Sequence, residues 1–149
     1  MTAEESLRRN LREVFDLPVE AIDWLLMLWG AIQVFDDVAD GDQVTRADLD
    51  AVIWNTLVVM PRNPFYALHF ATIAPMVASM ILKWQASDRV EVAGEPTAMS
   101  YAWRAGYYDV VLMVVQCCKG VDYATKNAHL VMALYGETLG DYLREFEHA

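Results

Sequence analysis

The sequence predicts an all-α protein, and three observations support this fold class. Apolar residues recur at helical spacing along most of the chain, whereas the strict alternation typical of strands is nearly absent. Hydrophobic residues make up 56% of the 149 residues, which is ample for a compact core and argues against disorder. The connections between apolar segments are short, so neighbouring helices should pack antiparallel. We therefore expect one domain over residues 1–149, a bundle of about six helices.

The first two helices are expected over about 4–15 and 19–39. Pro18 can open the second helix because its fixed φ suits the first helical turn. Gly41 should end that helix, since glycine readily adopts the left-handed conformation of a helix C-terminus. The third helix is expected over about 46–60, with Thr45 as its N-cap.

A proline-containing loop, P-R-N-P at 61–64, should separate the third helix from a fourth over about 64–86. Residues 64–82 contain no charged side chain. An uncharged helix of this length would just span a bilayer core of about 30 Å. Polar residues within this stretch favour a buried central helix over a membrane span: Tyr66, His69, Thr72 and Ser79.

The last two helices are expected over about 97–119 and 121–147, after a polar connection over 87–96. The end of the first is marked by Lys119 followed by Gly120. The final helix should place its apolar residues toward the core: Leu130, Met132, Leu134, Leu139 and Leu143.

The formal net charge of −10 excludes nucleic acid as a general partner, because phosphate binding requires clustered Lys and Arg. The same acidity suits a cation site or a basic protein partner. The two cysteines, Cys117 and Cys118, are adjacent and give no disulfide framework. Because the N-terminal helix lacks the apolar segment of a secretory signal, we expect a cytoplasmic protein.

The most informative motif is D-D-V-A-D, with Asp36, Asp37 and Asp40 after the apolar run 24–35. Gln33 is the only polar residue in that run. On a helix, Asp36 and Asp40 share a face, and a divalent cation would relieve their repulsion. Carboxylate oxygens suit Mg²⁺, which commonly binds one or two carboxylates together with substrate phosphates. The alternative is a polar helix end that precedes a turn.

A second acidic pattern occurs near the C-terminus, where Glu137, Asp141 and Glu145 follow one another at four-residue spacing. On one helix these side chains form a single acidic stripe. Helical bundles build metal sites from inward-facing side chains of this kind on facing helices. The alternative is an ordinary solvated helix face, since Asp and Glu are normally exposed.

Two segments resemble the aspartate-rich motifs of the class I isoprenoid synthases. The first is F-D-D-V-A-D-G-D at 35–42, with Arg46 shortly downstream. The second segment, Y-G-E-T-L-G-D-Y-L-R-E-F at 135–146, looks like a degenerate form of the second motif, with Asp141 and Glu145 in its outer acidic positions. The resemblance implies isoprenoid-synthase-like helical packing in which the motifs face each other across a cavity. There they would bind Mg²⁺ and an allylic diphosphate, whose departure leaves a carbocation among apolar and aromatic walls.

Two functions follow as hypotheses. The first is a Mg²⁺-dependent protein that binds a small-molecule diphosphate and resembles a minimal isoprenoid synthase, with no catalytic residue assigned. Its metal ligands would be Asp36, Asp37, Asp40, Asp141 and Glu145, and its substrate-side residues would be Gln33, Arg46, Arg104, Tyr108 and Glu137. The second is a non-enzymatic acidic helical protein that acts on a protein partner or as a homodimer or larger homo-oligomer.

Overall fold

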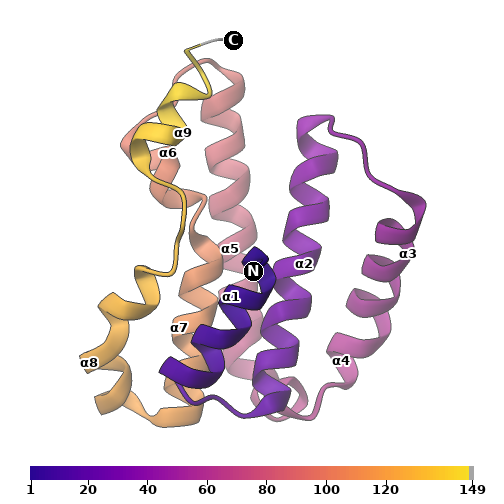
Figure 1. The fold of residues 1–149 in the computed structure, drawn as a ribbon, viewed down its shortest axis with the longest axis vertical. Coiled ribbons are helices and arrows are strands. Elements are labelled where there is room, and N and C mark those ends of the chain that lie inside the picture. Colours follow the sequence, from indigo (N-terminus) through magenta and orange to yellow (C-terminus); the bar gives the residue numbers. More distant parts are fainter. Residues whose placement is uncertain (148–149) are drawn as a thin grey trace. The chain divides into compact units, whose positions relative to one another are not determined.

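The computed structural model describes residues 1–147, and every regular element within them is a helix (Figure 1). The all-α prediction is therefore confirmed. The chain divides into two compact units, residues 1–70 and residues 71 onward. The single domain and the isoprenoid-synthase-like packing stay predictions.

The first unit is built from short and long helices that follow one another closely. Its elements are α1 (Ala3–Arg9), the π-helical η1 (Asn10–Val14), α2 (Val19–Asp40), α3 (Arg46–Trp54), the π-helical η2 (Asn55–Val59), α4 (Met60–Arg62) and the start of α5 (Pro64–Val92). The predicted helix starts and ends are largely confirmed. The Thr45 hydroxyl accepts a hydrogen bond of 3.1 Å from the Asp48 amide, and Gly41 ends α2 with a φ of 78°.

The predicted loop over 61–64 is wrong for most of its length. Pro61 lies in α4, near its start, where the missing backbone N–H is tolerated. Only Asn63 leaves the helical conformation, as expected for a residue that precedes proline. Its side chain donates a 2.9 Å hydrogen bond to the Glu20 carbonyl and accepts one of 3.1 Å from the Tyr66 amide. Asn63 therefore caps α5 and ties it to the start of α2.

The second unit contains the rest of α5 and four further helices. These are α6 (Ala98–Trp103), α7 (Gly106–Lys119), α8 (Val121–Met132) and α9 (Leu139–Arg144). The predicted connection over 87–96 is wrong over its first six residues, because α5 continues to Val92. Ser87 is buried there and its hydroxyl is bonded to Glu91 one turn later. Tertiary hydrogen bonds thus extend α5 through residues whose polar side chains, in the sequence, suggest an exposed connection.

The two helices predicted over 97–119 and 121–147 are each interrupted. The first breaks after α6, and α7 restarts at Gly106, where an added Cβ would lie 3.2 Å from the Met80 Cα. The second breaks after Met132, and α9 starts only after Thr138, whose hydroxyl caps it. These interruptions let α9 pack beside α6 (Figure 1).

Helix α5 differs from the predicted buried central helix. It contains the one segment in the described part of the chain that is long and apolar enough to cross a membrane, judged by length and composition alone. That window has a mean hydropathy of 1.7 but is only 11% buried. Leu68 and Leu82 are 79% and 66% exposed. Burial therefore does not explain the apolar character of this helix. Its length and composition are compatible with a membrane span but do not by themselves require one.

Candidate functional site

The aspartate motif occupies the last turns of α2 in the first unit. Asp36 is half-buried, whereas Asp37 and Asp40 are exposed. The Asp37 carbonyl accepts a 2.8 Å hydrogen bond from the Asp42 amide, which closes the turn around Gly41. The motif thus lies at the negative end of the α2 dipole, where carboxylates are unfavourable and a cation is favourable.

The two predicted substrate-side residues of this unit are both exposed. Gln33 lies on α2, and Arg46 opens α3. The Arg46 Nε donates a 2.9 Å hydrogen bond to the Asp50 carboxylate one turn later. Arg46 therefore makes an ion pair on its own helix, and its role toward a diphosphate stays a prediction.

The predicted acidic stripe near the C-terminus is wrong as a helical feature. Glu137 precedes α9, Asp141 lies in its first turn, and Glu145 is its C-cap residue. Asp141 is exposed and pairs with Arg144. The hydrogen bond from Thr138 and the charge of Arg144 lower the pKa of Asp141. Asp141 is thus a helix-end carboxylate, separate from the other two acids.

The predicted core positions beside that stripe are also partly wrong. Leu130, Met132 and Leu139 are 42%, 37% and 37% exposed. Val131 and Tyr142 are fully buried instead. On α8 the buried positions are Ala124 and Val131, seven residues apart, so Leu130 and Met132 lie off that face. Because α9 starts after a break, its buried position, Tyr142, does not continue the pattern of α8.

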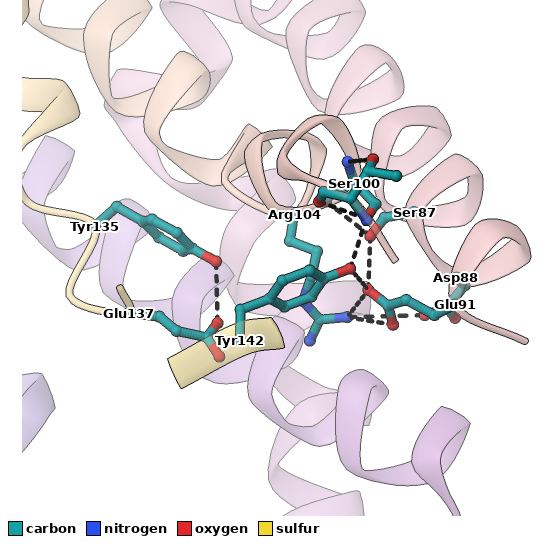
Figure 2. Close-up of polar contacts among 9 residues, drawn as sticks. Ser87, Asp88, Glu91, Ser100, Arg104, Tyr135, Glu137 and Tyr142 are labelled. Atoms are coloured by element: carbon teal, nitrogen blue, oxygen red, sulfur yellow. Dashed lines mark hydrogen bonds and ion pairs between the residues drawn. The ribbon is translucent and has the colours of Figure 1, made fainter. Parts of the chain in front are cut away.

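Arg104 is held in a nearly enclosed ion pair of the second unit (Figure 2). Its Nη1 donates to both oxygens of Glu91, at 3.0 and 3.1 Å, and Asp88 lies 3.9 Å away. The side chains of Arg104 and Glu91 are only 18% and 11% exposed. The Arg104 guanidinium also lies 5.9 Å from the centre of the Tyr142 ring. Arg104, predicted to face a diphosphate, is thus already bound to a carboxylate.

Three hydroxyl groups complete this cluster (Figure 2). Tyr142 donates to Glu91 at 2.8 Å and lies 2.7 Å from the Ser100 Oγ. Ser87 reaches Glu91 at 2.8 Å and the Ser100 carbonyl at 2.9 Å. Ser87, Ser100 and Tyr142 are all fully buried. The cluster therefore joins α5, α6 and α9, with every one of these groups hydrogen-bonded, as burial requires.

Aromatic rings cover one side of the cluster. The Tyr101 ring lies 5.1 Å from Tyr135 and 5.7 Å from Tyr142, and Phe146 lies 5.2 Å from Tyr142. Tyr108, predicted as a substrate-side residue, packs edge-on against Tyr135 at 5.6 Å. Burial raises the pKa of Tyr108, so its hydroxyl stays protonated. Its role toward a substrate stays a prediction.

Glu137, the first residue of the predicted stripe, lies beside these rings. Tyr135 donates a 3.1 Å hydrogen bond to the Glu137 carboxylate, and Tyr101 donates to the Glu137 carbonyl. Desolvation, followed by the influence of the Glu137 carboxyl, raises the pKa of Glu145 to about 7.

Among the described residues, no three His, Cys, Asp or Glu side chains are grouped so that they could hold a metal ion. The residues predicted as metal ligands belong to different units, the aspartate motif to the first and Asp141 with Glu145 to the second. A magnesium site shared by these residues stays a prediction.

Sequence reasoning missed most of the buried cluster. It singled out Arg104 but not Ser87, Glu91, Ser100 or Tyr142. A signal was present, because Ser87 and Glu91, like Ser100 and Arg104, are four residues apart and therefore share a helix face. Because residues 87–96 are predicted as a polar connection, the helical spacing of Ser87 and Glu91 is not part of that prediction.

The first unit has a second candidate site, an apolar surface on adjoining helices. Leu49, Ile53, Trp54 and Leu57, here called the α3–η2 face, are 40%, 47%, 61% and 72% exposed. Leu49 and Ile53 share a helix face, as do Ile53 and Leu57. Grouped large apolar side chains on a soluble surface mark sites of interaction more often than single ones do.

The fold and these sites define the chain as an all-α helical protein with a buried polar cluster and an exposed apolar face. Comparison with known proteins found no matching family model, no matching curated protein and no matching solved structure.

Proposed function

We propose that this protein acts by binding a protein partner through the α3–η2 face. The observation that carries the proposal is the exposure of Ile53, Trp54 and Leu57, at 47%, 61% and 72%. Leu57 shares a helix face with Ile53, four residues earlier, and with Trp54, three residues earlier. Transferring these side chains from water is favourable by roughly 25 cal/mol per Å² of buried apolar surface. Trp is also enriched among residues that dominate binding energy, so Trp54 is the natural anchor.

Charge indicates the chemistry of the partner. Residues 36–50, which lead into the face, contain six aspartates and one arginine. That arginine, Arg46, is paired with Asp50. An amphipathic helix with Leu-type residues on one side and flanking Lys or Arg would complement both the apolar α3–η2 face and the aspartates beside it. Binding of a second copy of this chain would bring together two chains that each carry a net charge of −10 and therefore repel each other.

Synthetic peptides provide a direct test. Two amphipathic helical peptides share one leucine pattern, with Lys at the polar positions of the first and Glu at those of the second. The Lys peptide should bind, and its affinity should fall at least about fivefold as salt rises from about 0.05 to 0.5 M. The Glu peptide should bind at least about tenfold more weakly. Equal affinity for both peptides would contradict the charge argument.

Matched variants distinguish binding at the α3–η2 face from nonspecific apolar association. Leu57→Ser should weaken binding of the Lys peptide about tenfold, because it removes an exposed apolar contact without disturbing the core. Leu82→Ser is the control, since Leu82 is similarly exposed at 66% but lies on α5 of the second unit. If both substitutions weaken binding equally, the α3–η2 face is not the site. If sedimentation shows a dimer that Leu57→Ser dissociates, the occupant is a second copy and the proposed partner is wrong.

Magnesium-dependent diphosphate binding is the second candidate, and one observation favours it. The last turn of α2 carries Asp37 and Asp40 and has no basic residue. A divalent cation there would offset both the carboxylates and the negative end of the helix dipole. A bound diphosphate would pair with Arg46 only by competing with the Asp50 carboxylate for its guanidinium. The resemblance of this motif to that of the isoprenoid synthases supports the same chemistry.

A further inference from the structure

A groove in the first unit is lined by residues of α1, α2, α3 and η2, where α2 packs with both α1 and α3 (Figure 1). Its volume is about 440 Å³, which lies within the range of roughly 300–1,000 Å³ typical of small-molecule sites. All of its lining residues belong to residues 1–70, so one compact unit contains the whole groove.

The buried part of the lining is apolar. Leu26, Ala31 and Val52 are all buried, and Val34 adds a half-buried apolar side chain. Gly30, also in the lining, has no side chain, and a Cβ built there meets no heavy atom within 4 Å outside its own stretch of helix. The groove is therefore open at Gly30 and can take the hydrocarbon part of a ligand, whose transfer from water is favourable.

The polar part of the lining carries more negative than positive charge. It contains three carboxylates, those of Glu4, Asp23 and Asp48, and one cation, Arg8. Arg8 lies 3.5 Å from the Asp23 carboxylate, so this cation is matched by one of the three. Among residues 1–147, the carboxylates of Glu4 and Asp48 have no ion-pair partner. The groove thus combines an apolar surface with two unmatched negative charges.

We propose that this groove binds a small organic amine, with its apolar body over Gly30 and its ammonium group paired with a carboxylate of the lining. The half-buried Asn55 offers an amide oxygen as a further acceptor for the ammonium group. An anionic ligand would meet the two unmatched carboxylates, and a neutral one would gain only from the apolar surface.

The groove is distinct from the α3–η2 face. Its α3 residues, Asp48 and Val52, share one side of the helix, and each directly precedes a residue of that face, Leu49 or Ile53. Successive residues of a helix are rotated by about 100°, so the two sets point in different directions. Binding in the groove is therefore a property separate from the proposed partner binding.

Three probes of similar size test the charge and the apolar contributions in the unmodified chain. Phenethylamine, phenethyl alcohol and phenylacetate share a phenyl ring and differ in charge. NMR shifts of the Gly30 amide and the Val52 methyl groups should saturate with the amine. The alcohol should bind about threefold more weakly, because one exposed ion pair contributes a factor of roughly 1.4–5, and phenylacetate should bind more weakly still. Equal affinity for the amine and the alcohol, or tighter binding of phenylacetate, would overturn the proposal.

A groove-filling variant tests the location. Gly30→Leu should weaken binding of phenethylamine at least about tenfold, because its side chain occupies the open space. Leu is a better helix former than Gly and meets no neighbour at its Cβ, so the variant should melt no lower than the unmodified chain. Undiminished binding by Gly30→Leu would place the amine elsewhere and overturn the proposal.

A pair of charge variants tests the role of the lining carboxylates. Asp48→Asn should weaken binding of phenethylamine about threefold. Asp42→Asn is the matched control, because it removes the same charge from an exposed residue outside the groove, and it should leave the affinity almost unchanged. Equal losses in the two variants would reduce the effect to net charge and contradict a pairing within the groove.

The Lys peptide of the proposed function distinguishes a small-molecule amine from a lysine side chain of a partner. It should bind without displacing phenethylamine, since the groove and the α3–η2 face lie on different sides of α3. Displacement would assign the groove to lysine side chains and overturn the small-molecule site. Amine binding by a chain that does not bind the peptide would support the groove and contradict only the proposed function.

Discussion

Substitution of Arg104 by Met should destabilise the second unit more than any surface charge change. Arg104→Met keeps the aliphatic length but leaves Glu91, which is 11% exposed, without its cation. Removing one partner of a buried ion pair generally costs about 3–5 kcal/mol. Glu91 keeps hydroxyl donors from Ser87 and Tyr142, so the lower value of about 3 kcal/mol is expected.

The assay is urea unfolding followed by far-UV circular dichroism, with thermal melts as a second readout. A loss of about 3 kcal/mol should lower the melting temperature by roughly 6–12 °C for a chain of this size. Arg46→Met is the matched control, because Arg46 makes a pair of similar length with its side chain 84% exposed. That variant should lose only about 0.5 kcal/mol or less.

A second substitution sharpens the test. Adding Glu91→Gln to Arg104→Met removes the uncompensated charge, so the double variant should recover at least about 1 kcal/mol relative to Arg104→Met alone. Equal losses for Arg104→Met and Arg46→Met, or no recovery in the double variant, would refute the buried ion pair as the element that secures α9.

Three further predictions concern other parts of the chain. Gly106→Ala should destabilise by about 1–3 kcal/mol in urea unfolding, because its Cβ would lie 3.2 Å from the Met80 backbone; an unchanged midpoint would refute this close approach. Thr45→Ala should cost about 1 kcal/mol in the same assay through loss of the α3 N-cap, whereas Thr45→Ser should cost little; equal losses would argue against capping. If the second candidate function is correct, Mg²⁺ with inorganic diphosphate should raise the melting temperature, and the double variant Asp36→Asn, Asp40→Asn should lose that response; no response in the parent would count against it.

The fold class and several helix ends follow from local signals. The N-cap at Thr45 and the C-terminus of α2 at Gly41 were predictable because each depends on a residue and its immediate neighbours. Helical periodicity predicted most helix starts for the same reason. The predicted loop at 61–64 failed because Pro61 sits where a helix tolerates it.

The candidate sites were less predictable because they depend on tertiary contacts. Glu137 and Glu145 were predicted to lie on one continuous helical stripe, yet the chain breaks after α8 and restarts at α9, so Glu137 precedes the helix and Glu145 is its C-cap residue. The extension of α5 through Ser87 and Glu91 depends on α6 and α9, which no local pattern reveals. Exposure of Ile53, Trp54 and Leu57 was equally hidden, since apolar periodicity normally predicts burial.

The most direct test of the proposed function is the NMR response of the Trp54 indole to the basic amphipathic peptide. The account predicts a saturable shift of the Trp54 N–H signal, absent with the acidic peptide of the same leucine pattern. Trp24 serves as the internal reference, because its side chain is 1% exposed and should not respond. A Trp54 signal that does not move, or that moves equally with both peptides, would contradict the claim that this face binds a basic partner.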